Sequence, residues 1–214
     1  MYGQQVAFDS VYCEGIEDIT PTDLRHAANL GYVLKLLAVA KCGGNGNGPL
    51  ELRVHPTLIP ATSPLASVRR EYNAIFFAGD AVGNQMFYGR GAGELPTASA
   101  VVGDLLLVGR ELAPARIFYR AQPLPLAPMA DTRCEYYLRF STVDRPGVLG
   151  RLCTLLGEHG ISILSCLQQE QQEAADYVHI VISTHTAREG DVRAALTAID
   201  RLDLIRQPSR FIRI

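Results

Sequence analysis

Hydrophobic positions in the last third of the chain repeat with two periods, one typical of strands and one typical of helices. The pattern predicts, in order, a strand over 134–144, a helix from 144 to 160, strands over 161–171 and 176–184, a helix over 189–202 and a strand over 210–214. This order of strand, helix, strand, strand, helix and strand is that of the ferredoxin-like βαββαβ fold.

The ends of the first of these helices carry recognisable signals. Asp144 is the candidate N-cap, with Pro146 just inside the helix, and Gly160 marks its end. A polar turn over 172–175 joins the two middle strands. Because both helices of such a fold lie on one face of the sheet, we expect the other face and one edge to be open to a partner.

The first half of the chain has a different pattern. A helix is predicted to begin near Thr20 or Thr22 and to end at Gly31. Residues 32–60 predict two strands around a Gly/Asn-rich turn, residues 72–91 predict another pair, and a helix follows from Pro96 to Leu112. We therefore expect an α+β fold, with a mixed or antiparallel sheet and helices followed by the ferredoxin-like domain.

Proline marks the boundary between the two parts. Pro114, Pro123, Pro125 and Pro128 lie in a stretch with little periodicity, and proline at this density stiffens an extended connection. We place a linker over 119–134, with one domain over 1–118 and the other over 135–214.

Composition narrows the class of protein. A net charge of −2 without a basic run argues against nucleic-acid binding, and the longest apolar runs are too short to span a membrane. The first residues lack the charged-then-apolar pattern of a signal sequence, and the five cysteines are scattered without a CxxC pair, so we expect reduced thiols and a cytoplasmic location. The five histidines include no pair at metal-ligand spacing, so we expect no metal.

Two glycine-containing loops are candidate binding sites. The stretch "YGRGAGELPTAS" (88–99) is not a dinucleotide fingerprint, because Glu94 or Pro96 stands where the third glycine is required. Its backbone can still approach a ligand closely at Gly91, Ala92 and Gly93. The stretch "VDRPGVLGRL" (143–152) places backbone amides at a helix start, where they suit a carboxylate, although an ordinary turn explains the same glycine.

The second of these loops carries a resemblance to a known family. Residues 136–214 resemble the ACT domain, an amino-acid-sensing module, through "DRPGVLGRL", "HGISILSCLQQ" and "YVHIVISTH". The resemblance implies that such domains pair and bind an effector amino acid between the two copies. The implied effector-binding residues are Asp144, Pro146, Gly147, Val148, Leu149, Ser165 and Gln168.

The first half resembles the catalytic domain of homoserine dehydrogenase. The matching stretches include "EGIEDITPTD" (14–23), "VHPTLIPATSPLASV" (54–68) and "MFYGRGAGELPTASAVVGDL" (86–105). The resemblance implies reduction of L-aspartate 4-semialdehyde to L-homoserine with NADP or NAD, in the route to threonine, methionine and isoleucine. Gly91, Ala92 and above all Gly93 would then contact the nicotinamide end of the cofactor, and threonine would be the feedback effector.

The same resemblance also implies what lies outside the chain. The family's Rossmann domain, its proton-donating lysine and its substrate-binding acidic residues precede the matched region, so no catalytic residue is assigned here. We interpret the acidic residues Glu14, Glu17 and Asp18 as structural for the same reason. We expect the chain to be the C-terminal part of such an enzyme, inactive alone and self-associating through its ACT domain. The alternative is a free-standing amino-acid sensor without catalysis.

Overall fold

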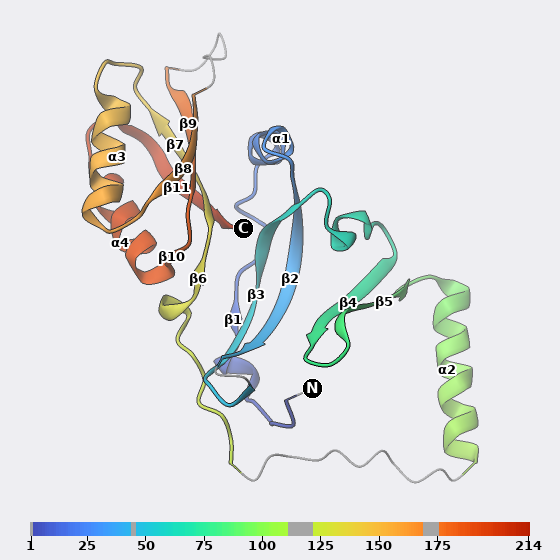
Figure 1. Cartoon of the computed structure of the whole chain (residues 1–214). Coiled ribbons are helices and arrows are strands. Elements are labelled where there is room, and N and C mark those ends of the chain that lie inside the picture. Colours follow the sequence, from blue (N-terminus) through green and yellow to red (C-terminus); the bar gives the residue numbers. More distant parts are fainter. Residues whose placement is uncertain (1, 44–45, 111–121, 169–175) are drawn as a thin grey trace. The chain divides into compact units, whose positions relative to one another are not determined.

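The computed structural model describes residues 2–43, 46–110, 122–168 and 176–214 (Figure 1). These residues form two compact units. The larger unit contains the described residues of 4–58 and 122–214, and the smaller contains those of 1–3 and 59–121. No helix in the ranges described is long and apolar enough to cross a membrane.

A mixed sheet forms the centre of the larger unit, with strand order β1-β3-β11-β7-β9-β8 and β2 paired to β3. Its strands are β1 (Tyr12–Cys13), β2 (Tyr32–Cys42), β3 (Leu50–Pro60), β7 (Tyr136–Thr142), β8 (Ile163–Gln168), β9 (Val178–Thr184) and β11 (Ile205–Arg213). β3 runs parallel to β1 and β11, whereas β11, β7, β9 and β8 pair antiparallel. The predicted α+β class with a mixed sheet is confirmed.

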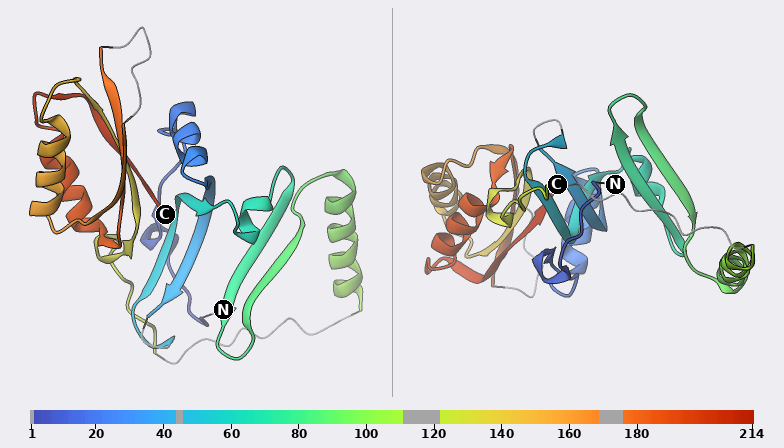
Figure 2. Two further views of the ribbon diagram at one scale, coloured as in Figure 1. Left: turned by 45° about the horizontal axis from the view of Figure 1, so that its top comes forward. Right: turned by 90° about the horizontal axis from the view of Figure 1, so that it is seen from below.

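The C-terminal elements follow the predicted βαββαβ order. Helices α3 (Val148–Glu158) and α4 (Glu189–Ile199) lie on the same side of the sheet in both views of Figure 2. Alternate residues of β7, namely Tyr136, Leu138 and Phe140, are fully buried beneath them. The apolar stripes of the two helices cover this face of the sheet and form the largest hydrophobic core. The predicted turn over 172–175 lies outside the described residues.

The predicted N-cap of α3 is wrong. The helix begins at Val148, and its N-cap is Gly147, which has no side chain to form a capping hydrogen bond and whose φ is +89°. This left-handed conformation favours glycine. It lets the chain turn into the helix without a capping side chain, which leaves Asp144 three residues outside the cap. Gly160, with φ +71°, follows the last turn as predicted.

The outer face of the ACT-like sheet is not open, contrary to the sequence-based expectation. Helix α1 (Pro21–Asn29) packs there, and Ala27 joins Leu58, Tyr137, Val181 and Ile212 in a second buried cluster. Tyr137 alternates with Tyr136 along β7, so the two faces of one strand contribute to two cores. The surface we expected a partner to occupy is covered by the chain's own first helix.

Local signals explain why α1 forms. Thr20 is its N-cap, as the sequence predicted for Thr20 or Thr22, and the Thr20 hydroxyl accepts a hydrogen bond from the Asp23 amide. The Asp23 carboxylate in return accepts from the Thr20 amide at 3.1 Å. This capping box satisfies two amides that the helix start leaves open. Gly31, with φ +80°, follows the end of the helix.

Part of the predicted linker is in regular contact with the larger unit. Leu50 pairs with Leu126 in a parallel bridge, and the short strand β6 (Arg133–Cys134) pairs with β10 (Ala187–Arg188). A 3-10 turn, η4 (Met129–Asp131), lies between them. Residues 119–121 of the predicted linker lie outside the described residues, and the domain boundaries remain a prediction.

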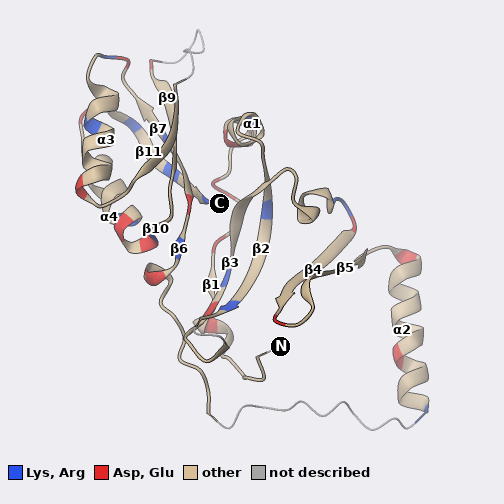
Figure 3. Ribbon diagram, in the orientation of Figure 1, with Lys and Arg blue, Asp and Glu red and all other residues tan. Residues whose placement is uncertain are grey.

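The smaller unit contains a hairpin and a helix. β4 (Tyr72–Gly79) and β5 (Gly83–Arg90) pair antiparallel over their whole length, and α2 (Glu94–Gly109) follows. The helix begins two residues before the predicted Pro96, and the predicted end at Leu112 lies outside the described residues. Charged positions are sparse along α2 (Figure 3), and apolar side chains such as Leu95, Leu105 and Val108 are exposed in this unit.

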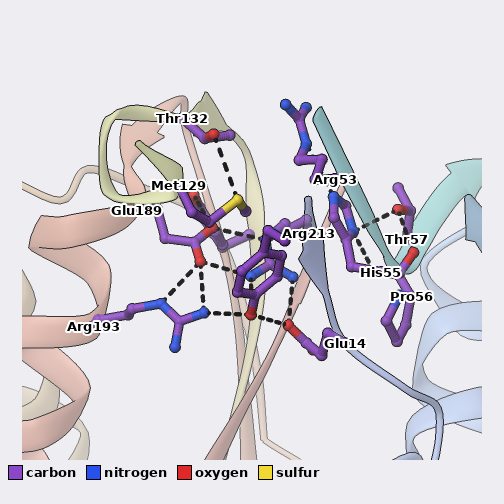
Figure 4. A network of polar contacts seen from close by, with 12 residues as sticks. Glu14, Arg53, His55, Pro56, Thr57, Met129, Thr132, Glu189, Arg193 and Arg213 are labelled. Atoms are coloured by element: carbon purple, nitrogen blue, oxygen red, sulfur yellow. Dashed lines mark hydrogen bonds and ion pairs between the residues drawn. The ribbon is translucent and has the colours of Figure 1, made fainter. Parts of the chain in front are cut away.

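A buried network of ion pairs joins residues near the start of the larger unit's sequence to residues near its end (Figure 4). Arg213, at the end of β11, donates to both carboxylate oxygens of Glu189 at 2.7 and 2.6 Å and to Glu14 at 2.9 Å. Arg193 donates to Glu189 as well, at 2.9 Å. Burial alone would raise the pKa of the Glu189 carboxyl, but Arg213 and Arg193 outweigh it and lower the pKa. The network therefore stays charged at neutral pH.

Removal of the Glu189 charge should destabilise the larger unit strongly. The side chains of Arg213 and Glu189 are 1% and 0% exposed, and breaking a buried pair typically costs about 3–5 kcal/mol. Urea denaturation of Glu189→Gln should show a loss of this size. Asp191→Asn, on the same helix but 47% exposed, is the control and should change stability by less than about 1 kcal/mol. Equal losses in the two variants would contradict a special role for the buried pair.

Candidate functional site

The loop between β7 and α3 lines a pocket of about 350 Å³. The pocket brings together six of the seven residues that the sequence singled out for an effector: Asp144, Pro146, Gly147, Val148, Leu149 and Gln168. Val143, Arg145 and Ile180 complete its lining. Residues from the loop and from β8, some twenty positions apart, therefore meet at one site.

Ser165 is the sequence-predicted residue that the pocket does not include. Its hydroxyl lies 2.6 Å from the hydroxyl of Ser183 on the neighbouring strand β9. Ser165 pairs with Ser183 in the sheet register, so this contact is a cross-strand pair within one sheet. The structure gives Ser165 a partner within the chain, apart from the pocket.

Sequence reasoning missed Arg145. This residue lines the pocket just described and also a second hollow of about 320 Å³, formed with Asp203 and Arg206. A cationic side chain beside the start of α3 adds to the partial positive charge of the helix N-terminus. Arg145 lies in the sequence between Asp144 and Pro146, two of the residues predicted to bind an effector. Arg145 and the helix start favour a carboxylate, and Asp144 in the same lining favours a cationic group.

The glycines of the 91–93 loop have structural explanations of their own. A Cβ atom at Gly91 would overlap the side-chain amide of Asn73, and the Gly91 amide donates to the Glu71 carbonyl at 2.8 Å. Gly93 is the N-cap of α2, with φ +120° and ψ 153°, a conformation that only glycine adopts readily. The loop thus needs glycine to join β5 to α2, whatever else it contacts.

The same loop leaves its backbone open to a close approach. Gly91, Ala92 and Gly93 leave little side chain between a ligand and the backbone at the start of α2. The unit that contains them is an antiparallel hairpin with one helix, and the described residues form no βαβ crossover of a dinucleotide-binding domain.

The acidic residues near the start of the chain do not converge on a catalytic pair. Glu14 accepts hydrogen bonds from Arg213 and from the Tyr12 hydroxyl, the latter at 2.7 Å. Asp18 pairs instead with Arg210 at 3.1 Å. All five cysteines are free thiols. In the part of the chain that the structure describes, no group of three or more His, Cys, Asp or Glu residues could bind a metal ion.

Comparison with known proteins agrees with this architecture. The sequence model of the homoserine dehydrogenase family matches residues 1–106, and that of the ACT domain matches residues 136–204. A homoserine dehydrogenase of Synechocystis sp. is 40% identical over 223 residues, which cover 100% of this chain. The chain belongs to the homoserine dehydrogenase family. Its ACT domain is the βαββαβ part described above.

Two further relatives extend the comparison. Homoserine dehydrogenase of Corynebacterium glutamicum is 38% identical over 98% of this chain and 48% of the relative. The crystal structure of a homoserine dehydrogenase from Thiobacillus denitrificans superposes with a TM-score of 0.83 at 38% identity, covering 97% of this chain and 48% of that chain. The chain thus spans about half the length of the homoserine dehydrogenases that it matches, including 51% of the Synechocystis enzyme.

The strain at Gly93 leads to a prediction for this family member. Gly93→Val should destabilise the start of α2 by about 1–3 kcal/mol, because a β-branched residue cannot adopt φ +120° without strain. Gly103→Ala, in the middle of the same helix with nothing within 4 Å of the added methyl group, is the control. It should stabilise the helix by about 0.5–1 kcal/mol. Amide hydrogen exchange of α2 measures both effects, and an unchanged α2 in Gly93→Val would show that this conformation is not required.

Proposed function

We propose that this chain contributes the substrate-side and regulatory portion of an NAD(P)-dependent homoserine dehydrogenase. The reaction would be reduction of L-aspartate 4-semialdehyde to L-homoserine in the cytoplasm, in the route to threonine, methionine and isoleucine. The observation that carries the proposal is similarity to homoserine dehydrogenases along the whole chain, at 40% identity to the Synechocystis enzyme. The family uses NAD or NADP as the hydride carrier.

The chain's own residues would position one end of the cofactor. Gly93 and its neighbours would let the nicotinamide approach the backbone at the start of α2, because these residues present almost no side chain. The cofactor would supply the hydride, while the rest of the enzyme would bind the substrate and its proton donor. The hairpin β4–β5 supports this loop through the contact of Gly91 with Asn73.

The ACT domain would bind an amino-acid effector, with threonine as the proposed ligand. Its carboxylate would lie at the start of α3 near Gly147, and Arg145 would add a favourable charge. Gln168 would contact the ligand from β8, which is the edge strand of the sheet. Because α1 covers the outer sheet face, self-association of this domain would use the β8 edge, next to the pocket. Effector binding would alter the enzyme by a coupling free energy of roughly 1–3 kcal/mol.

A chimera tests the catalytic part of the proposal. The segment of the Synechocystis enzyme that has no counterpart here is fused in front of this chain, and NADH or NADPH formation from homoserine is followed by absorbance. We expect turnover from the chimera and none from the 214-residue chain by itself. Turnover by the chain alone, above a mock purification, would contradict the proposed division of roles. A folded but inactive chimera would favour a sensor without catalysis.

A pair of glycine variants tests the effector site. Gly147→Asp adds bulk and negative charge to the pocket. The φ of +89° strains any side chain, but Asp adopts this region more readily than most residues and open space surrounds the added Cβ, so the fold should survive with some loss of stability. Gly160→Asp is the matched control, since Gly160 also has positive φ and open space but lies at the other end of α3. Calorimetry with threonine should show at least about tenfold weaker binding for Gly147→Asp, equivalent to about 1.4 kcal/mol. Gly160→Asp should bind like the wild type; equal affinity in both variants would remove Gly147 from the site.

A further inference from the structure

His26 is an unusual residue in the interface between α1 and the ACT sheet. It lies in the last turn of α1 and is 2% exposed. Both of its ring nitrogens are buried, and neither has a hydrogen-bond partner among the described residues. Buried polar atoms are nearly always paired, so an imidazole with two unpaired nitrogens calls for an explanation.

The groups around His26 come from three elements. Arg139 of β7 pairs with Asp23 of α1 at 2.6 Å, and both side chains are buried. His179 of β9 lies edge-on to His26, with ring centroids 5.9 Å apart. Arg25 of α1 adds a further positive charge. His26 therefore lies near one carboxylate, Asp23, and near the positive charges of the buried Arg139 and the exposed Arg25.

That carboxylate is fully engaged. Asp23 accepts from the Arg139 guanidinium at 2.6 and 3.3 Å, from the Tyr137 hydroxyl at 3.1 Å and from the Thr20 hydroxyl at 2.6 Å. The Thr20 amide donates to it as well. Asp23 therefore balances the charge of Arg139 and has no lone pair left for a second cation at His26.

Protonation of His26 would place an additional charge in this interface. The imidazolium would gain two donors without acceptors, at a site that excludes water and already contains Arg139. The end of a helix favours a cation. Here, however, the ring nitrogens contact no carbonyl oxygen. Burial and the neighbouring charges therefore decide whether His26 is neutral or protonated. The neutral ring is the form that the packed interface accepts.

We propose that His26 makes the attachment of α1 to the ACT sheet sensitive to pH, with the helix attached when His26 is neutral and released as it becomes protonated. The device would link the homoserine dehydrogenase part of the chain to its regulatory domain. The proposed pH dependence follows from the packing of α1 against the sheet and does not depend on which effector the ACT domain binds.

The direction of the effect follows from the pKa. Burial lowers the pKa of His26, and Arg139 and Arg25 lower it further against the opposing effect of Asp23. Burial and Arg139 also lower the pKa of His179. The released state therefore binds more protons than the packed state, and stability is lost as the pH falls below the ordinary histidine value of about 6.5. The pKa of Asp23 is itself lowered, so its titration lies well below this range.

Hydrogen exchange on the full chain measures the attachment directly. Protection of the α1 amides, corrected for intrinsic exchange rates, should fall by up to about tenfold between pH 7.5 and pH 5.5, the factor set by a group with an ordinary pKa near 6.5. Amides of α4, which lies on the opposite face of the sheet, should change much less. Unchanged protection of α1 across this range would overturn the proposal.

Two variants and one titration separate His26 from other groups. His26→Leu should remove most of the pH dependence, leaving only the part that His179 contributes, and α1 should stay at least as well protected at pH 7.5, because no hydrogen bond is lost. His185→Leu, at an exposed histidine, is the control and should keep the wild-type response. Should His26→Leu not fold, NMR titration of the wild-type imidazole decides the question: a His26 pKa at or above the ordinary value contradicts the proposal, and a lowered one supports it.

Discussion

The ion network around Arg213 is the interaction on which the larger unit depends. Its guanidinium is 1% exposed and binds Glu189 of the ACT domain together with Glu14, 199 positions earlier in the chain. A buried charge that loses its partner is costly, so each of these residues requires the others. The network thereby holds Glu14, in the homoserine dehydrogenase part, against α4 and β11 of the ACT domain. Strands from both parts belong to one sheet.

This shared sheet limits what each surface of the ACT domain can do. Helices α3 and α4 cover the inner face, and α1 covers the outer face through Ala27 and the Asp23–Arg139 pair. The β8 edge and the Gly147 loop remain outside these contacts, and they are where the pocket lies. The same contacts bring His26 into a site that accepts its neutral form.

Periodicity predicted the elements well because each depends on near neighbours. The βαββαβ order, the Thr20 cap and the two hairpins are properties of short stretches of sequence. The failures depend on distant contacts or on single dihedral angles. Asp23 meets Arg139 across 116 positions, so the covered sheet face could not be read from either segment. Sequence patterns favour Asp144 as the cap of α3 because Asp is a common capping residue, whereas the left-handed conformation of Gly147 has no signature in the sequence. Six of the seven residues predicted to bind an effector line one pocket because they belong to one loop and the strand beside it.

Native-state hydrogen exchange over a series of urea concentrations tests most directly whether the two family domains form one cooperative unit. If the Arg213 network joins them, the amides of β3 and those of β7 and β9 should exchange through a common opening, with the same free energy and the same dependence on urea. Exchange of β3 through a separate opening of lower free energy, while β7 and β9 stay protected, would contradict the account.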